Sequence, residues 1–417
     1  MRQATRLFLT GWAAALVLAG CASVGPDAPV VRPDDRLPPD LRRPPETSPA
    51  RPGNPPSVPP SPATGETVIP GTPTLSERDV KTLINRLLPG GIRDRSGWTN
   101  DLYSAFQSLG LPHAAPVYCT VIAVIEQESS FQADPVVPGL NTIVWNELEA
   151  RGKRFGIPRL VIEAAMLKTS PDGRSYKQRI DTLKTEKQLN GLFEDMISEL
   201  PAGKQLFADY NPVRTGGPMQ VSIAFAEQHA RERSYPYSPI RSIRDEVFTR
   251  RGGVYFGSAI LLDYPAPYTE VVYRFADFNA GRYSSRNAAF QAAVVRLTGA
   301  DLSLDGDLLR YAKGQAVPEP SSVEIALRRQ VDRLRLSPGE IRRDLLLEKS
   351  PAFSQSPLWQ RVFSLADAQA GQVLPRQIMP RIDLKSPKIV RKLTTEWFAR
   401  RVEGRFRTCL AREGQGN

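Results

Sequence analysis

Three short clusters in this chain combine the residue types that cleavage of a sugar chain requires. In chain order they are Glu128-Ser129, Gly217-Pro218-Met219-Gln220 and Phe278-Asn279-Ala280-Gly281. A glycosidic bond breaks when its leaving oxygen receives a proton, and apolar surroundings keep a carboxyl group protonated near neutral pH. Glu128 follows the apolar run 121–125 and precedes Phe131. We therefore expect Glu128 to be enclosed by apolar groups and to act as a general acid, with Ser129 beside it.

The positions of apolar residues predict that helices carry these clusters. A helix that begins near Pro116 is apolar almost all round, so we expect it to be buried and to end at Glu128. A helix from Val271 runs into the third cluster, where Gly281 is also suited to end a helix. Few segments alternate as strands do, so the chain is expected to be mainly α-helical. Further helices are predicted over residues 76–88, 100–109, 143–153, 158–167, 176–200, 223–232, 254–262, 287–297, 323–334, 357–366 and 389–410.

The N-terminal residues predict export and attachment to a membrane. Arg2 and Arg6 precede a short apolar stretch, 7–18, as in a secretory signal, and this stretch is too short to span about 30 Å of hydrocarbon. The run Leu-Ala-Gly-Cys that ends at Cys21 resembles the lipobox of bacterial lipoproteins, in which the Cys is acylated. The alternative is an ordinary signal with a chance Cys. The resemblance implies a lipid anchor at Cys21 in the outer membrane, with the chain facing the periplasm.

The rest of the chain divides by composition. Residues 1–20 form the predicted signal, and residues 21–75 contain sixteen prolines and few large apolar residues. Such a segment builds no core, so we expect a disordered tether that reaches on the order of 150 Å when fully extended. Residues 76–300 are expected to form the domain that carries the three clusters, with a helical insertion at 135–213. Residues 301–417 are expected to form a basic helical C-terminal region.

The charge and the scarcity of His and Cys narrow the classes of function. The formal net charge is +11, which suits weak attraction to wall carboxylates or outer-membrane phosphates. No nucleic-acid-binding motif is present. With two His and three Cys, one of them Cys21, we expect neither a metal site nor a cofactor. A Ser-His-Asp triad has no supporting Gly-x-Ser-x-Gly elbow. Protein partners and oligomeric state stay open.

Cys119 and Cys409 are the two other cysteines. An oxidising periplasm permits a disulfide between them. They are equally compatible with two buried thiols, because Cys119 lies in an apolar run and a buried Cys behaves as a small hydrophobic residue. Of the two states we slightly favour unpaired thiols.

The three clusters resemble those of a known enzyme family. Glu-Ser-x-Phe at a helix end, then Gly-x-Met-Gln, then Asn-Ala-Gly is the order in lytic transglycosylases related to goose-type lysozyme. The resemblance covers about residues 115–295 and implies a lysozyme-like helical fold. It implies that Glu128 is the catalytic acid and that Gly257 is the family's helix glycine between the second and third motifs. It also implies that the glycan strand contacts Ser129, Gly217, Met219, Gln220, Phe278 and Asn279.

The same resemblance implies a reaction on peptidoglycan with a single carboxyl. Glu128 is expected to protonate the bond that follows an N-acetylmuramic acid, and then to accept the proton of the 6-hydroxyl of that sugar. This oxygen closes on C1 and gives a 1,6-anhydro product. The acetamido group stabilises the intermediate, as in the substrate-assisted exceptions to two-carboxylate hydrolysis. The expected function is therefore that of an outer-membrane lytic transglycosylase, a lyase.

Two departures from the family pattern weaken this expectation. The interval from Glu128 to Gly217, 217 − 128 = 89 positions, is much longer than in compact members, so the insertion must fold away from the cleft or cover it. Phe278 replaces a Tyr whose hydroxyl would contact the glutamate, and Tyr273 or Tyr283 would have to substitute for it.

Other functions and other site residues therefore stay open. A catalytically inactive peptidoglycan-binding lipoprotein with a lysozyme-like fold is the first alternative. A hydrolase that uses a second acid, Asp134 or Asp277, is another. Trp145, Trp359 and Trp397 are able to stack on sugars, but a helical Trp more often belongs to the core.

Overall fold

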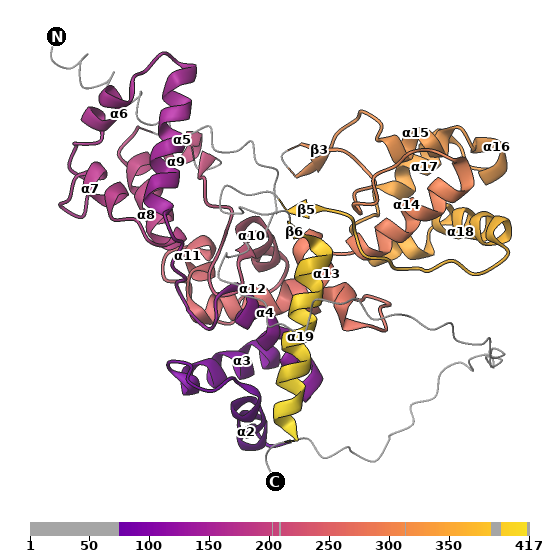
Figure 1. Ribbon diagram of the computed structural model, residues 1–417, viewed down its shortest axis with the longest axis horizontal. Helices are drawn as coiled ribbons and strands as arrows, with labels where there is room; N and C mark the ends of the chain where they lie inside the picture. The colour runs from indigo at the N-terminus through magenta and orange to yellow at the C-terminus, as the bar shows by residue number, and fades with distance from the viewer. Residues whose placement is uncertain (1–74, 202, 208–209, 313, 385–392, 415–417) are drawn as a thin grey trace.

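The computed structural model describes residues 75–201, 203–207, 210–312, 314–384 and 393–414 (Figure 1). The predicted signal, Cys21, the Pro-rich tether before residue 75 and residues 389–392 of the last predicted helix lie outside this part of the chain. Within it α-helices dominate and the strands are two residues long, which confirms the prediction of a mainly α-helical protein. No helix in these ranges is long and apolar enough to cross a membrane.

In the described ranges the helices follow one another along the chain, with three short antiparallel strand pairs between them. The helices are α2 (Glu77–Leu87), α3 (Arg95–Leu109), α4 (Ala115–Glu128), α5 (Leu140–Arg154), α6 (Arg159–Ala165), α7 (Tyr176–Asp181), α8 (Glu186–Ser198), α9 (Gly203–Phe207), α10 (Ile223–Glu232), α11 (Ile243–Val247), α12 (Arg250–Leu262), α13 (Val271–Ala280), α14 (Ser284–Thr298), α15 (Ser322–Arg328), α16 (Val331–Leu334), α17 (Pro338–Leu345), the 3-10 helix η3 (Pro351–Gln355), α18 (Pro357–Ala370) and α19 (Thr395–Glu413). The strand pairs are β1 (Thr215–Gly216) with β2 (Val221–Ser222), β3 (Tyr311–Ala312) with β4 (Gln315–Ala316), and β5 (Asp383–Leu384) with β6 (Leu393–Thr394).

Most predicted helices are present, with bounds that differ by a few residues. α10 has the predicted bounds, 223–232. α12 begins at Arg250, four residues before its predicted start, because the Thr249 side chain accepts the Gly252 N–H and caps it. The prediction of one helix over 176–200 is wrong, since α7 and α8 are separate. Thr185 begins α8 with a capping box to Gln188, which satisfies the N–H groups at the new helix start. The predicted helix 323–334 is likewise two helices, α15 and α16.

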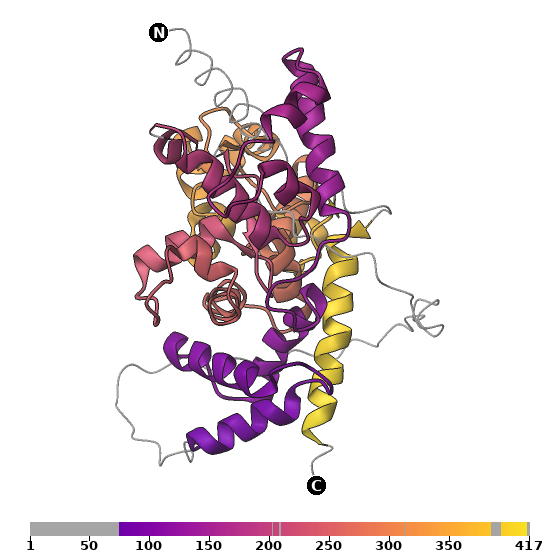
Figure 2. The same cartoon turned by 90° about the vertical axis from the view of Figure 1, so that its left-hand side faces the viewer.

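The first hydrophobic core is built by α2, α3, α4, α12, α13 and α19, and it continues through α10 and α11 into α5–α8. Residues 118–125 of α4 are all buried, as its apolar circumference predicts. α19 covers one side of α4, while α2 and α12 contact other sides. α19 is the long yellow helix that runs past α13, α4 and α2 in Figures 1 and 2. α4, which ends at the candidate acid, is thus a central helix of this core.

A disulfide joins Cys119 on α4 to Cys409 on α19, with the two Cα atoms 5.5 Å apart. The prediction of unpaired thiols is therefore wrong. Both residues are fully buried, as was expected of the thiols, but the packing of α19 on α4 sets them side by side. The same end of α19 is attached to α2, because Arg412 donates a hydrogen bond of 2.9 Å to the Leu87 carbonyl.

A second, smaller core lies among α14, α15, α17 and α18. Phe290 on α14 stacks on Trp359 of α18 with ring centres 5.7 Å apart, and Phe353 and Phe363 complete the aromatic group. Residues 301–417 are therefore divided between the two cores. The segment that contains α15–α18 builds the second core with α14, whereas α19 returns to the first.

Residues 135–213 form a helical projection that contains α5–α9. In both views it lies at the opposite end of the molecule from α2 and α3 (Figures 1 and 2). At its base Asp134 accepts a hydrogen bond of 3.0 Å from the Thr185 hydroxyl, and Val136 pairs with Thr185 as an isolated β-bridge. Asp134, a candidate second acid, therefore holds the base of the insertion to the start of α8.

Glu348 is a buried carboxyl of the second core, and we expect it to make stability fall as pH rises. It accepts hydrogen bonds from the Leu308 N–H and the Tyr311 hydroxyl. Burial raises the pKa of Glu348 to about 7, with Asp307 adding to this effect and Lys349 opposing it. The folded state keeps this proton after the unfolded chain has released it. The free energy of unfolding should therefore fall by on the order of 2–3 kcal/mol between about pH 4 and pH 7.

The variant Glu348→Gln is expected to flatten this slope, measured by urea unfolding at a series of pH values. Burial also raises the pKa of Asp277 to about 6, so the slope that remains in the variant should lie below about pH 6. A variant that keeps the wild-type slope between about pH 6 and pH 7 would contradict the assignment to Glu348.

Candidate functional site

Glu128 is the last residue of α4 and is 3% exposed, with both carboxylate oxygens shielded from solvent. α4 ends here because Ser129 leaves the helical conformation, and its hydroxyl donates to the Ile125 carbonyl at 3.0 Å. The chain then turns with positive φ at the next two residues, and the Phe131 ring meets Trp98 edge-on, with centres 5.1 Å apart. The structure thus places Glu128 in the enclosed position that its apolar neighbours predict.

Two polar side chains just before Glu128 attach α4 to α19. Gln127 accepts hydrogen bonds from Arg401 and Arg405, at 3.1 and 3.0 Å. Arg405 also pairs with Glu126 at 3.0 Å. Glu126 is therefore engaged in holding α19 against α4. Glu128 remains the candidate acid of this helix end.

The second cluster forms a tight turn that rests on α12. Met219 is fully buried, and a Cβ atom built at Gly257 would lie 2.2 Å from its sulfur and 2.8 Å from its Cβ. One helical turn earlier, a Cβ atom at Gly253 would lie 2.4 Å from the Pro218 ring. Two glycines on one face of α12 therefore allow the turn to approach the helix backbone closely. Gly257 is the glycine for which the resemblance implies a place on the helix between the second and third motifs.

Gln220 and Gly217 fix the shape of this turn. Both have positive φ, 49° and 72°, and a Cβ atom at Gly217 would lie 2.0 Å from the Val247 carbonyl oxygen. The Gln220 side chain is 8% exposed and stays local, accepting from the Thr215 hydroxyl at 3.3 Å and donating to the Gly217 carbonyl at 3.4 Å. In this structure the Gln220 amide therefore holds the turn together.

Replacing Gly257 by alanine is expected to lower the free energy of unfolding by about 1–3 kcal/mol, because the new methyl group overlaps Met219. The matched control is Gly404→Ala in α19, where nothing lies within 4 Å of the added Cβ. This control should raise stability by about 0.5–1 kcal/mol, since alanine costs less backbone entropy than glycine in a helix. Urea unfolding measures both. Equal effects of the two changes would contradict close docking of the turn on α12.

The third cluster is the C-terminal end of α13, which Gly281 terminates with φ of 111°. Asn279 is 3% exposed, and its Oδ1 accepts a hydrogen bond of 2.8 Å from the Thr395 hydroxyl. Its amide nitrogen is buried and has no hydrogen-bond partner in the part of the chain that the structure describes. Phe278 is half-buried and packs against the first core, so it makes apolar contacts there.

The two tyrosines considered as substitutes for that hydroxyl have other neighbours. Tyr283 is buried, and the Arg286 guanidinium lies 4.1 Å from its ring centre. Tyr273 is half-buried, with its ring centre 5.9 Å from that of Tyr268. Burial raises the pKa of both hydroxyl groups, so both stay protonated at neutral pH. Neither of these contacts places a tyrosine hydroxyl against Glu128.

Asp277, the second candidate acid, is fully enclosed by hydrogen-bond donors. Its carboxylate accepts from the hydroxyls of Tyr264 and Tyr268, at 3.2 and 2.7 Å, and from the N–H groups of Tyr283 and Ser285, at 2.9 and 2.7 Å. Burial is the largest influence on its pKa and raises it to about 6, although the donors oppose this effect. The carboxyl thus fixes the turn between α13 and α14.

Backbone conformations of high energy gather at the three clusters. Among the described non-glycine residues, six have positive φ, and four of these are Ser130, Phe131, Gln220 and Tyr283. The first two directly follow Glu128-Ser129, Gln220 ends the second cluster, and Tyr283 lies two residues after Gly281. Such conformations cost of order 1–3 kcal/mol each and concentrate at functional sites. Their distribution therefore supports a shared site.

α19 brings the first and third clusters into one region, a contribution that sequence reasoning missed. Its first residue, Thr395, bonds to Asn279, and Arg401 bonds to Gln127, next to Glu128. These two contacts lie six positions apart on the helix, a rise of about 9 Å along the axis. α12, which carries the turn of the second cluster, packs against both α4 and α13. The clusters therefore belong to one group of adjoining helices, α4, α12, α13 and α19 (Figure 1).

The tryptophans considered as sugar-stacking residues are mostly structural. Trp145 is buried in α5 and donates a hydrogen bond of 2.8 Å to Asp181. Trp359 belongs to the second core. Trp397 is half-buried, and the Arg401 guanidinium lies 5.5 Å from its ring centre. The first two therefore match the core interpretation.

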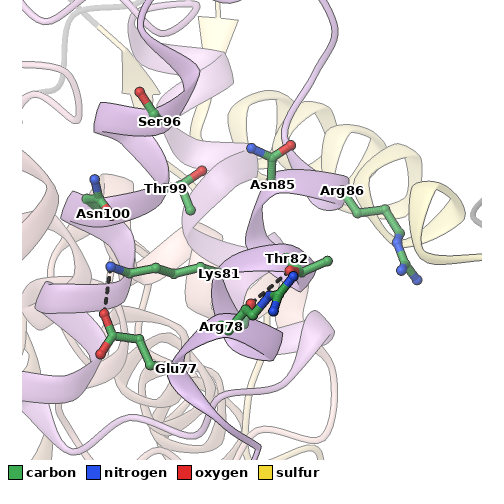
Figure 3. Close-up of a pocket in the computed structure, with 9 residues that line it drawn as sticks. All are labelled: Glu77, Arg78, Lys81, Thr82, Asn85, Arg86, Ser96, Thr99 and Asn100. Atoms are coloured by element: carbon green, nitrogen blue, oxygen red, sulfur yellow. Dashed lines mark hydrogen bonds and ion pairs between the residues drawn. The ribbon is translucent and has the colours of Figure 1, made fainter.

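A polar groove of about 780 Å³ lies elsewhere, between α2 and α3 (Figure 3). Glu77 and Lys81 on α2 form an ion pair of 2.7 Å at one side, and Ser96, Thr99 and Asn100 on α3 line the other. None of the residues of the three clusters lines this groove. It is therefore distinct from the candidate site.

Comparison with known proteins assigns the chain to a family. Residues 91–412 match the family described as "Protein of unknown function (DUF1615)", and this segment contains all three clusters and nearly all of α19. The chain is also similar to a protein of Escherichia coli (strain K12) named "Uncharacterized protein YaiW". The two are 48% identical over 332 residues, which cover 80% of this chain and 90% of the relative. No solved structure matches. The chain belongs to the DUF1615 family.

Proposed function

We propose that this protein is a lytic transglycosylase of peptidoglycan with a lysozyme-like fold in the domain that carries the three clusters. The observation that carries the proposal is the enclosed Glu128 at the end of α4, within the same group of helices as the Met219 turn and Asn279. Burial disfavours the charged form of a carboxyl group, and a general acid must deliver a proton to the leaving oxygen. The order of the motifs along the chain supports the same assignment.

In the proposed reaction Glu128 is the only carboxyl that acts on the substrate. It donates its proton to the oxygen that leaves C1 of N-acetylmuramic acid, while the acetamido group of that sugar stabilises the positive charge at C1. The carboxylate then accepts the proton of the 6-hydroxyl as this oxygen bonds to C1. The product is a 1,6-anhydro sugar, and Glu128 recovers its proton. Asp134 and Asp277 are not needed, in keeping with their structural hydrogen bonds.

Residues of the other two clusters are proposed to bind the glycan. Ser129 lies next to the acid, and Phe278 lies next to the Asn279 amide. The turn on which a strand would rest is shaped by Gly217, Met219 and Gln220. Asn279 supplies a buried amide donor. Because the carboxylate oxygens of Glu128 are shielded from solvent, a strand reaches them only after neighbouring groups move. If those groups return once the strand is bound, water is excluded, which favours attack by the 6-hydroxyl over hydrolysis.

The enclosure of Glu128 and the presence of Phe278 also favour a second candidate function. A lipoprotein that binds peptidoglycan without cleaving it would retain the same helices and the same amide donor. In that case the acid would have no path to a glycosidic oxygen. Phe278 would also not supply the hydroxyl contact to the acid that a tyrosine makes in lytic transglycosylases. This candidate differs from the first in one property only, the release of fragments.

We further propose that the protein is anchored in the outer membrane through acylated Cys21 and faces the periplasm. The Cys119–Cys409 disulfide supports an oxidising compartment outside the cytoplasm. The Pro-rich tether would let the folded part reach the wall. The expected partners are glycan strands and the membrane, without nucleic acid, metal or cofactor.

Incubation of the mature chain, purified in detergent, with purified peptidoglycan tests the proposal. Release of soluble muropeptides, followed by chromatography, is expected from the enzyme. The inactive binding protein should instead co-sediment with the insoluble wall and release nothing. A chain that neither binds nor releases fragments would contradict both candidates.

A further inference from the structure

The first residue of α19 lies at the candidate site and is fully enclosed. Thr395 is 0% exposed, and its hydroxyl donates the 2.8 Å hydrogen bond to Oδ1 of Asn279 across 116 positions of sequence. Its backbone N–H donates to the Ile382 carbonyl at 3.1 Å, and the preceding Thr394 caps the helix through the Trp397 N–H. The Thr395 hydroxyl is therefore held in place by a capped helix start.

This hydrogen bond decides which way the Asn279 amide faces. With Oδ1 engaged, the nitrogen must donate in another direction, and it has no acceptor among the described residues although it is buried. A buried donor without an acceptor costs about 1–3 kcal/mol, and natural proteins rarely keep one without a use. A bound ligand with an acceptor oxygen would satisfy it.

α19 is fastened to the helix of the candidate acid as well. The Cys119–Cys409 disulfide, the Arg405–Glu126 ion pair at 3.0 Å and the Arg401–Gln127 hydrogen bond at 3.1 Å all join it to α4. The same rigid helix therefore contacts the segment that ends at Glu128 and, through Thr395, the amide of Asn279. Movement of α19 would change the spacing between acid and amide.

We propose that Thr395 is a positioning residue of the glycan site. It orients the Asn279 amide so that its nitrogen donates to the carbonyl oxygen of an acetamido group on the glycan. This inference rests on the proposed glycan site but not on catalysis, because binding alone requires it. An acetamido carbonyl is a strong acceptor that every N-acetylated sugar of a peptidoglycan strand carries.

The test uses the mature chain and the tetramer of N-acetylglucosamine, with affinity measured by calorimetry. Thr395→Val keeps the side-chain shape and removes the hydroxyl, so the dissociation constant should rise about 5- to 30-fold. Thr395→Ser keeps the hydroxyl and should restore most of the affinity. In the background of Asn279→Ala the Val substitution should add no further loss, because Thr395 acts only through that amide.

The outcomes separate this inference from the proposed enzyme. Wild-type affinity in Thr395→Val, or equal losses with and without Asn279, would overturn the positioning role. Equal losses in the Ser and Val variants would overturn it too, since they indicate a structural effect. Failure of the wild-type chain to bind either the tetramer or the insoluble wall would overturn it together with the glycan site. Binding without fragment release would contradict only the catalytic proposal. Thermal unfolding of each variant checks that it is folded.

Discussion

Replacing Glu128 by glutamine is expected to lower the rate of muropeptide release by about 10²–10⁴-fold, the contribution of a general acid or base. The amide has nearly the volume of the carboxyl but neither donates an acidic proton nor accepts one from the 6-hydroxyl. Because Glu128 is only 3% exposed, the neutral amide should also fit its enclosed position. Release of soluble fragments from purified peptidoglycan measures the change.

Glu126→Gln is the matched control for this variant. Glu126 lies two positions earlier on α4 and pairs with Arg405 on α19 at 3.0 Å, so its carboxyl is used for packing. Its glutamine variant should retain the wild-type rate with a small loss of stability, as expected for the partly exposed ion pairs of Glu126 with Arg405 and Arg412. Glu128→Gln with full activity, or equal losses in the two variants, would contradict the assignment of Glu128 as the acid.

Removing the Cys119–Cys409 disulfide is expected to have the largest effect on stability. The double variant Cys119→Ala/Cys409→Ala should lose about 2–5 kcal/mol of unfolding free energy, because the bond closes a loop of 290 positions. Without it the unfolded chain gains conformational freedom, and α19 is held on α4 only by side-chain contacts. Urea unfolding followed by far-ultraviolet circular dichroism measures the difference.

Reduced wild-type protein is the control for the cysteine variant. If the effect comes from the covalent bond, treatment with a thiol reductant should shift the wild-type midpoint toward that of the double variant. The variant itself should not respond to the reductant. A double variant as stable as the oxidised wild type would contradict the role of the bond in holding α19. A loss that only the variant shows would assign the effect to packing of the two sulfur atoms.

Local patterns predicted most helices because the apolar spacing and the capping residues that mark a helix lie within or next to it along the chain. The bounds of α10 follow from its apolar spacing, and the all-round apolar character of α4 predicted its burial. The break between α7 and α8 was not predicted, although Thr185 and Gln188 have the residue types and the spacing of a capping box. In that case the local signal for a second helix start was present in the sequence.

Contacts between distant segments set the limits of prediction at the site. The setting of Glu128 was predictable, since its apolar neighbours lie within about two helical turns of it along the chain. The partner of Asn279 was not, because Thr395 lies 116 positions away and carries no motif. The presence of a second cysteine, Cys409, beside Cys119 was the one feature of the sequence that could link α19 to α4, and either state of the thiols fitted the composition. Only the packing of α19 on α4 decided between them.

The C-terminal region, residues 301–417, also shows a division that depends on contacts between distant segments. Residues 301–417 share a basic, helical composition, which gave no reason to divide them. The segment that contains α15–α18 packs on α14, which makes aromatic contacts with α18, whereas α19 packs on α4 and α13. Composition therefore grouped segments that tertiary packing separates.

The most direct measurement of the central claim is the mass spectrum of fragments formed in water labelled with heavy oxygen. Cleavage by Glu128 through the 6-hydroxyl predicts 1,6-anhydro muropeptides that contain no label, because no water adds to C1. Fragments with a labelled reducing end would contradict this reaction and indicate hydrolysis. The absence of any fragment, with the protein still bound to the wall, would contradict catalysis altogether.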